Sequence, residues 1–217
     1  MKKYLILFIA IISFNVSFAQ DPLNLDSIKA NVTDKASPFF YEKLVYQFNF
    51  NPGTIGLEEA KHLYYGKTYA NYKVPFSTQQ EISRAELNDL IKGKKYDEAI
   101  FEGEKMIRNS PADIEVLGLL MYSLLQTDKK DEDLQYLRGY QFQKLIETVK
   151  RNKSGTDKKP IYTVTSIPDE YVIAGILNLD LKNFTRRTTY NKIGALDMWK
   201  NGKQKIIFQV VYDVEAP

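Results

Sequence analysis

The clearest pattern of apolar positions lies between residues 95 and 110. Six small or apolar residues recur there at i, i+3, i+4, i+7, i+10 and i+11, namely Tyr96, Ala99, Ile100, Gly103, Met106 and Ile107. This spacing places them on one face of an α-helix. Pro111 cannot continue a helix, so we expect the helix to end just before it. A second stripe with the same phase begins at Leu117 and predicts a neighbouring helix.

Two helices are expected nearer the N-terminus. Ser37 followed by Pro38 is typical of a helix start, and the apolar positions that follow keep four-residue spacing to Phe48. Helical spacing returns over residues 57–66, where Gly66 occupies the place of a left-handed C-terminal cap. The stretch NPGTIG between them predicts a turn.

Two more helices flank the clearest one. Thr78 and Glu81 match a capping box, in which each side chain accepts a hydrogen bond from a free backbone amide, and Gly93 ends the helix that they begin. Weaker apolar periodicity over residues 134–149 predicts a last helix. Residues 20–150 are therefore expected to form a helical region.

Beyond residue 160 the pattern indicates strands. The stretches IYTVTSI and EYVIAGIL are rich in β-branched and aromatic residues. Asn201 and Gly202 stand between two apolar runs, which is the strongest short signal for a β-hairpin. No helix of comparable strength interrupts these segments. We therefore expect an α+β fold, in which an antiparallel sheet over residues 161–217 packs on the helical region.

The stretch between the two patterns, residues 151–160, is basic and polar and contains Gly155 and Pro160. This composition predicts an exposed linker. A solvated loop explains its Lys and Arg residues more simply than a polyanion site does. We expect the helical and β regions to form one compact unit on either side of it.

The first nineteen residues have the three parts of a secretory signal peptide. Lys2 and Lys3 are positive, a nine-residue apolar run follows, and small residues stand three and one positions before Gln20. The run is too short for a permanent membrane span, which needs about 20 residues. We expect residues 1–19 to be removed and the product to be periplasmic or secreted, without a permanent span.

The composition disfavours several classes of function. The chain has no cysteine and one histidine, so we expect neither a disulfide nor a transition-metal site with several His or Cys ligands. Its net charge is +3, or +1 without Lys2 and Lys3, which gives no electrostatic case for nucleic acid. No phosphate-binding glycine loop and no G-x-S-x-G motif are present. We therefore expect no cofactor, no metal and no nucleic-acid partner.

Residues 80–113 resemble one tetratricopeptide repeat. The resemblance rests on Gly93, on the run YDEA with its small Ala99, and on Pro111, and it departs from the repeat at Gly103, where an aromatic residue is expected. It implies helical hairpins over about residues 80–149. Because a free-standing solenoid needs about three repeats, these hairpins should pack against the rest of the chain.

The order of four loose motifs resembles a secreted family of Bacteroidota described as a domain of unknown function. The motifs are HLYYG at 62–66, GKKYDEAI at 93–100, SG at 154–155 leading into IPDEY at 167–171, and the closing LDMWKNGKQKIIFQV. Together they cover nearly all of the chain after residue 19. The resemblance implies the architecture and export, and it implies no activity.

The stretch HLYYGKTYANY is the first candidate binding site. It contains His62, Tyr64, Tyr65, Tyr69 and Tyr72. Because tyrosine has an apolar body and a polar hydroxyl, it suits interfaces and half-buried seams. We expect most of these rings to join the N-terminal segment to the first helical pair. The alternative is a groove in which the hydroxyls and His62 meet a ligand.

A second candidate site follows Pro168, where Asp169, Glu170 and Tyr171 stand at the expected entrance to a strand. A turn is the simpler interpretation, because a paired-carboxylate hydrolase needs a partner across a cleft. The leading hypothesis is a non-enzymatic module that binds a protein or peptide of the cell envelope, and we assign no catalytic residue. The alternatives are an envelope hydrolase that uses Asp169 and Glu170, and a structural or stress-related envelope protein.

Overall fold

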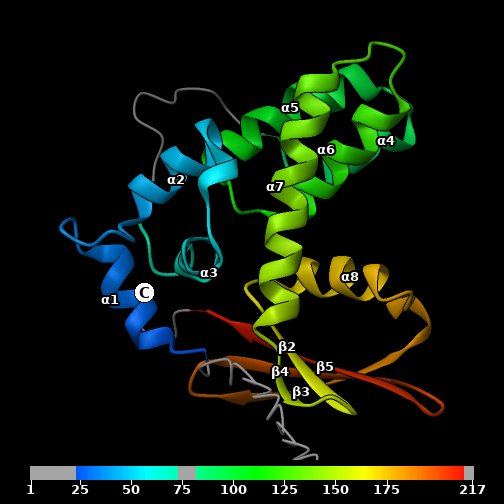
Figure 1. Ribbon diagram of the computed structural model, residues 1–217. Coiled ribbons are helices and arrows are strands. Elements are labelled where there is room, and N and C mark those ends of the chain that lie inside the picture. The colour runs from blue at the N-terminus through cyan, green and yellow to red at the C-terminus, as the bar shows by residue number, and fades with distance from the viewer. Residues whose placement is uncertain (1–22, 73–81, 213–217) are drawn as a thin grey trace, which may run out of the picture.

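The computed structural model describes residues 23–72 and 82–212 (Figure 1). In chain order the elements are α1 (Leu25–Thr33), α2 (Tyr41–Phe50), η1 (Pro52–Thr54), α3 (Leu57–Gly66), α4 (Arg84–Lys92), α5 (Tyr96–Asn109), α6 (Ile114–Gln126), α7 (Glu132–Arg151), β1 (Ser154–Thr156), β2 (Lys159–Val164), α8 (Ile167–Ile176), η2 (Leu181–Asn183), β3 (Thr185–Asn191), β4 (Gly194–Asn201) and β5 (Gln204–Val211). The expected signal peptide and the expected capping box at Thr78 and Glu81 lie outside the described residues.

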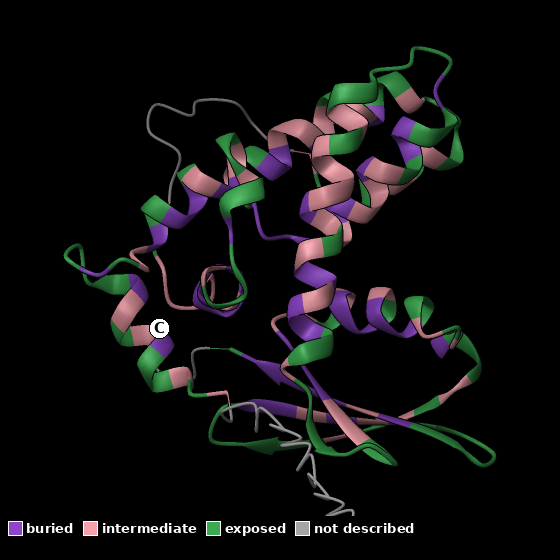
Figure 2. Ribbon diagram, in the orientation of Figure 1, coloured by how far each residue is buried: buried purple, intermediate pink, exposed green. Residues whose placement is uncertain are grey.

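The α+β arrangement is confirmed, because within residues 23–72 and 82–212 seven α-helices precede the sheet and an eighth lies across one face of it (Figure 1). One cluster of buried apolar side chains extends from α1 to β5. Helix α3 has buried residues on nearly all sides, including Ala60, Leu63, Tyr64 and Tyr65. Figure 2 shows this burial, and it shows that the hairpin turns of the sheet are exposed. A helix buried all round is the central element of such a core.

The helices after residue 82 begin and end for identifiable reasons. Ser83 and Glu86 form a complete capping box at the start of α4, which ends at Gly93 as expected. In α5 four residues of the expected stripe are buried, namely Ala99, Gly103, Met106 and Ile107, while Tyr96 and Ile100 are half-buried. A methyl group on Gly103 would lie 2.7 Å from Cδ2 of Leu120, so glycine permits the close approach of α5 and α6.

One expected helix start and one expected cap conformation in the N-terminal part are wrong. Helix α2 begins at Tyr41, because Ser37 instead closes a turn in which its hydroxyl accepts from the backbone N–H of Phe39 at 3.0 Å. Gly66 is the last residue of α3 and has no left-handed conformation. A methyl group there would lie 2.5 Å from Cγ1 of Val32, so this glycine serves the close approach of α1 and α3.

The stretch EYVIAGIL forms helix α8, so the predicted strand is wrong. Ser166 caps the helix by accepting from the backbone N–H of Asp169 at 3.3 Å, and Pro168 occupies its first turn. Proline with a capping serine is a helix-start signal, and here it outweighs the β propensity of Val and Ile. The buried residues of α8 are Asp169, Glu170, Ile173 and Ala174, which follow helical spacing.

The sheet has the order β1-β2-β5-β4-β3 and is mixed. The expected antiparallel pairing holds except between β2 and β5, which are parallel because α8 carries the chain across before β3 begins. The expected linker at 151–160 instead forms the end of α7, strand β1 and the start of β2. It is largely exposed, as its composition indicates. The predicted hairpin between β4 and β5 is confirmed, with Gly202 at a φ of 55°.

Candidate functional site

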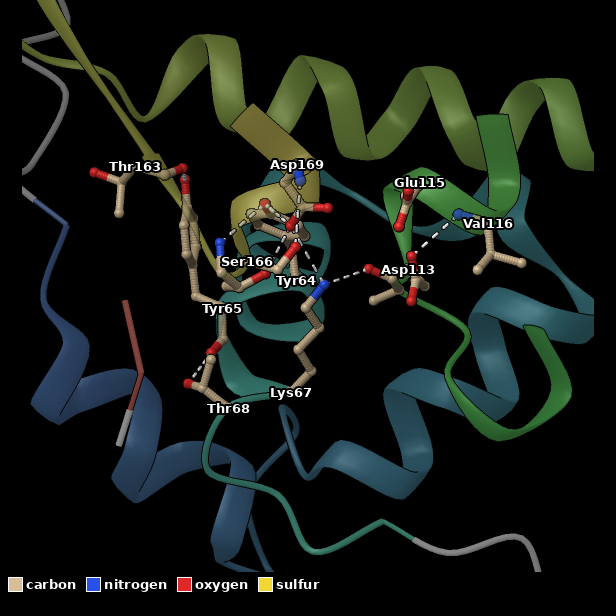
Figure 3. A network of polar contacts seen from close by, with 12 residues as sticks. Tyr64, Tyr65, Lys67, Thr68, Asp113, Glu115, Val116, Thr163, Ser166 and Asp169 are labelled. Atoms are coloured by element: carbon tan, nitrogen blue, oxygen red, sulfur yellow. Dashed lines mark hydrogen bonds and ion pairs between the residues drawn. The ribbon is translucent and has the colours of Figure 1, made fainter. Parts of the chain in front are cut away.

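Two tyrosines on α3 cross the core and contact the C-terminal part of the chain (Figure 3). The Tyr64 hydroxyl donates to Oδ2 of Asp169 at 2.8 Å and accepts from the backbone N–H of Thr165 at 3.2 Å. The Tyr65 hydroxyl donates to the backbone carbonyl of Thr163 at 3.2 Å. Both rings are fully buried, and they meet edge to face with centroids 4.9 Å apart. The two hydroxyls therefore join α3 to β2 and α8.

Asp169 is the acceptor at the centre of this network. Its Oδ2 also accepts from the Thr165 hydroxyl at 3.1 Å and lies 3.7 Å from Nζ of Lys67. Lys67 donates to the backbone carbonyl of Ala112 at 2.9 Å and lies over the ring of Tyr64. Oδ1 of Asp169 is buried and has no hydrogen-bond partner in the part of the chain that the structure describes. Burial and the charge of Asp169 raise the pKa of Tyr64, so its hydroxyl stays a donor.

A second polar cluster lies beside the first, where α4 meets α6 (Figure 3). Asp113 caps α6 by accepting from the backbone N–H of Val116 at 3.1 Å, and it also pairs with Arg84. Nε of Arg84 lies 3.0 Å from Oε2 of Glu115, within ion-pair distance but outside hydrogen-bond geometry. Burial raises the pKa of Glu115. Arg84 therefore pairs with Asp113 and lies beside Glu115, whose Oε2 has no hydrogen-bond partner in the described part of the chain.

Glu170 lies about 100° around α8 from Asp169 and faces the sheet. Its Oε2 accepts from Nε1 of Trp199 at 2.8 Å. Burial, with a hydrogen bond to Asp197, raises the pKa of Glu170 to about 8. Asp197 accepts from Arg186 and from the Thr188 hydroxyl, each at 2.5 Å. These bonds outweigh burial and hold the pKa of Asp197 below its usual range, so near neutral pH Glu170 is protonated and Asp197 is charged.

His62 lies away from both carboxylates, in the contact between α1 and α3. Its Nδ1 lies 2.8 Å from the backbone carbonyl of Glu58, and its Nε2 lies 3.3 Å from Nδ2 of Asn31. The ring stacks on Phe39 with centroids 4.0 Å apart. Burial lowers the pKa of His62. The histidine therefore joins α1 and α3 in its neutral form.

The remaining predicted site residues are spread over the molecule. Tyr69 lies beneath Nζ of Lys29, and the ring of Tyr72 meets Tyr41 edge to face at 5.8 Å. Tyr171 is exposed, and its ring meets the ring of Trp199 edge to face, with the centroids 5.5 Å apart. The structure thus brings together Tyr64, Tyr65 and Asp169 and separates them from the other candidates.

Most rings of the tyrosine-rich stretch were expected to join the N-terminal segment to the first helical pair, and Tyr69 and Tyr72 do contact the N-terminal segment. The two buried hydroxyls of the stretch instead reach α8 and β2, which was missed because α8 had been interpreted as a strand. The sequence did not identify Lys67 as a partner of Asp169, Trp199 as a partner of Glu170, or Arg186 as a partner of Asp197. Pro168 behind Ser166 was the signal that could have placed Asp169 and Glu170 in the first turn of a helix, where acids are common.

Residues 26–215 match the family described as a domain of unknown function, DUF4919. The chain belongs to the DUF4919 family. The match covers all described elements except the first residue of α1. Among curated proteins and among solved structures, the chain has no match.

The two carboxylates of the DUF4919 domain are poorly placed for chemistry on a substrate. Asp169 and Glu170 are fully buried, and their side chains bind protein groups on opposite sides of α8. In residues 23–72 and 82–212, no three His, Cys, Asp or Glu side chains gather in a way that could hold a metal ion. In the same residues, no helix is long and apolar enough to cross a bilayer. The geometry favours a structural role for both acids.

Proposed function

We propose that this DUF4919 protein is an exported, non-enzymatic module that binds a peptide segment of a cell-envelope protein. The observation that supports this proposal is a groove of about 630 Å³ between α6 and α7. Its lining consists of Met121, Glu132, Gln135, Tyr136, Gly139, Tyr140 and Gln143. Pockets that take ligands combine apolar and aromatic walls with a few polar groups, as this lining does.

Aromatic side chains on α7 provide the groove with an exposed surface that a peptide can contact. Tyr136 is 75% exposed, and its ring lies 6.5 Å from that of Tyr140. Gly139 leaves room below them, since a methyl group there would lie 3.3 Å from Cε of Met121. Exposed tyrosines with a flexible methionine suit a surface that accepts the apolar side chains of a peptide.

The likeness to tetratricopeptide repeats adds support. Helices α4, α5, α6 and α7 pack against one another in chain order, the small Ala99 and Gly103 are buried on α5, and Gly103 lies close to Leu120 of α6. Such hairpins commonly present grooves to extended or helical peptides. Export is proposed from the basic, apolar and small-residue pattern of residues 1–19.

The hydrolase alternative has less support. It requires a substrate to reach Asp169 and Glu170, and both side chains are buried against protein partners. A structural or stress-related envelope role is compatible with the buried networks, but it does not explain why Tyr136 is left exposed in a groove.

A random peptide library displayed on phage tests the binding proposal. The protein should enrich peptides with a shared apolar motif, and Tyr136→Ala/Tyr140→Ala should weaken their binding by about tenfold or more. The matched control is Tyr46→Ala/Phe50→Ala, which removes another exposed aromatic pair at i and i+4, on α2. If the groove variant melts lower than the wild type, Tyr136→Ala alone replaces it, because that ring is exposed.

Two results would overturn the proposal. One is the enrichment of no peptide beyond those that an unrelated helical protein captures. The other is an equal loss of binding in the groove variant and in the α2 variant, because binding through the α6–α7 groove requires a difference between them.

A further inference from the structure

The outer face of the sheet, on the side away from α8, carries exposed positive charge. Side chains alternate along each strand, and Trp199 and Phe208 point toward the buried side. An odd number of positions separates Lys200 from Trp199, and Lys205 and Ile207 from Phe208. These three side chains therefore point outward. By the same alternation, Lys159 and Arg187 also belong to the outer face. All four Lys and Arg side chains are exposed.

Two of these lysines stand directly opposite each other. Lys200 on β4 pairs in register with Lys205 on β5. Like charges in directly opposed positions destabilise a sheet. No acidic side chain forms an ion pair with Lys159, Lys200, Lys205 or Arg187 in the described part of the chain. The fold keeps an unfavourable charge pair that a bound anion would relieve.

Further lysines lie at the same end of the sheet. Strands β2 and β5 are parallel, so the turns that precede them lie side by side. These turns carry Lys158 and Lys203, both exposed. Residues 150–212 contain twelve Lys and Arg but only five Asp and Glu, and three of the five acids are the buried Asp169, Glu170 and Asp197. This segment of the chain is therefore much more positive than the net charge of the whole chain indicates.

The form of this patch favours one class of anionic partner. Its charges come from four strands and two hairpin ends, so they spread in two dimensions and do not follow a line. Beside them the outer face exposes part of Ile161, Met198 and Ile207. Strands β1 to β5 place no aromatic ring on this face, whereas sheets that bind single-stranded nucleic acid stack bases on such rings.

We propose that the outer face of the sheet binds the surface of an anionic phospholipid bilayer. The lysines contact the headgroups, and the three half-buried apolar side chains rest at the boundary of the acyl chains. Binding is peripheral and reversible, and it leaves the α6–α7 groove free. The proposal does not depend on the peptide-binding function.

Sedimentation with vesicles tests this proposal on the purified protein. The protein should sediment with vesicles of equal parts phosphatidylglycerol and phosphatidylcholine and should not sediment with pure phosphatidylcholine. Raising NaCl from 50 to 500 mM should release it, because salt screens charge. Lys200→Glu/Lys205→Glu should reduce partitioning by about tenfold or more. Lys92→Glu/Lys95→Glu changes the net charge equally at exposed positions near α4 and should have little effect.

A stability measurement excludes misfolding as the cause of lost binding. Lys200→Glu replaces a like-charge pair across the strands with an opposite-charge pair, so this single variant should melt at or above the wild-type temperature while it binds vesicles more weakly. Equal binding by the sheet and control variants would overturn the proposal. So would binding to poly-L-glutamate or to single-stranded DNA in place of vesicles, since either result would identify a linear polyanion as the partner.

Discussion

Asp169 and Glu170 are consecutive residues on one helix, equally buried, and the fold accommodates them in opposite ways. Asp169 points toward the helical part, where Tyr64, Thr165 and Lys67 supply donors and a positive charge. Glu170 points toward the sheet, where burial and Asp197 raise its pKa to about 8. Asp169 accepts hydrogen bonds from protein donors, whereas Glu170 stays protonated and can itself donate a hydrogen bond.

The free-energy cost of burying a carboxyl group therefore depends on the groups around it, and not on whether the residue is Asp or Glu. One helical step of about 100° turns neighbouring side chains to different neighbours. An anion buried without donors would cost several kcal/mol, and both arrangements avoid that cost. Helix α8 is consequently fixed on each side by a polar contact, one to α3 and one to β4.

The largest expected effect concerns Glu170→Gln. The folded-state pKa of Glu170 is above the usual value of 4.5, so the unfolded state loses its proton first as pH rises. The wild type should lose stability from about pH 4.5 upward until about pH 8, by up to about 1.4 kcal/mol per pH unit. Glutamine cannot ionise, so the variant should be close to wild type at pH 5 and more stable by about 3–5 kcal/mol at pH 8.

Urea unfolding between pH 5 and pH 9 measures this difference, and the exposed Glu98→Gln is the control. Parallel pH profiles for Glu170→Gln and the wild type would mean that Glu170 is ionised in the folded protein. In that case Glu170 would not be the protonated acid that distinguishes the sheet side of α8 from the Asp169 side.

The next effect is the loss of the anion on the helical side. Asp169→Ala leaves the Tyr64 hydroxyl without its acceptor and the largely buried Lys67 ammonium without its nearby negative charge. Removing one partner of such a pair should cost about 3 kcal/mol of unfolding free energy. Asp157→Ala, whose side chain is 96% exposed, should cost less than about 0.5 kcal/mol. Similar midpoints in urea for the two variants would contradict the role given to Asp169.

Local signals in the sequence were enough to place most elements. The apolar stripe from Tyr96 to Ile107 and the Asn201-Gly202 hairpin were predicted correctly, because each depends on a few adjacent residues. Helix α8 was missed because its Val and Ile residues favour strands, and the weight of Ser166 and Pro168 was underestimated. That error also produced the expectation of an all-antiparallel sheet.

The candidate site was less predictable than the fold. Tyr64 and Asp169 are 105 positions apart in the chain, and Glu170 and Trp199 are 29 apart. No spacing rule connects such residues, since only the packing of α3, α8 and β4 brings them together. The composition identified tyrosine and acid as candidates, and it could not show that they would bond to each other inside the core.

The smallest expected effects come from two isosteric changes, one on each side of α8. Thr165→Val removes a donor to Asp169, and Thr188→Val removes a donor to Asp197. Each should cost about 1 kcal/mol at pH 7, the usual net value of a hydrogen bond to a partly buried group. The bond from Thr188 helps to lower the pKa of Asp197, so its contribution is present above the unfolded-state pKa of 3.8 and is lost as pH falls through the lower folded-state value. Urea unfolding should therefore show that Thr188→Val loses less unfolding free energy at pH 3 than at pH 7. An equal loss at the two pH values would mean that Asp197 is not the charged acid on the sheet side of α8.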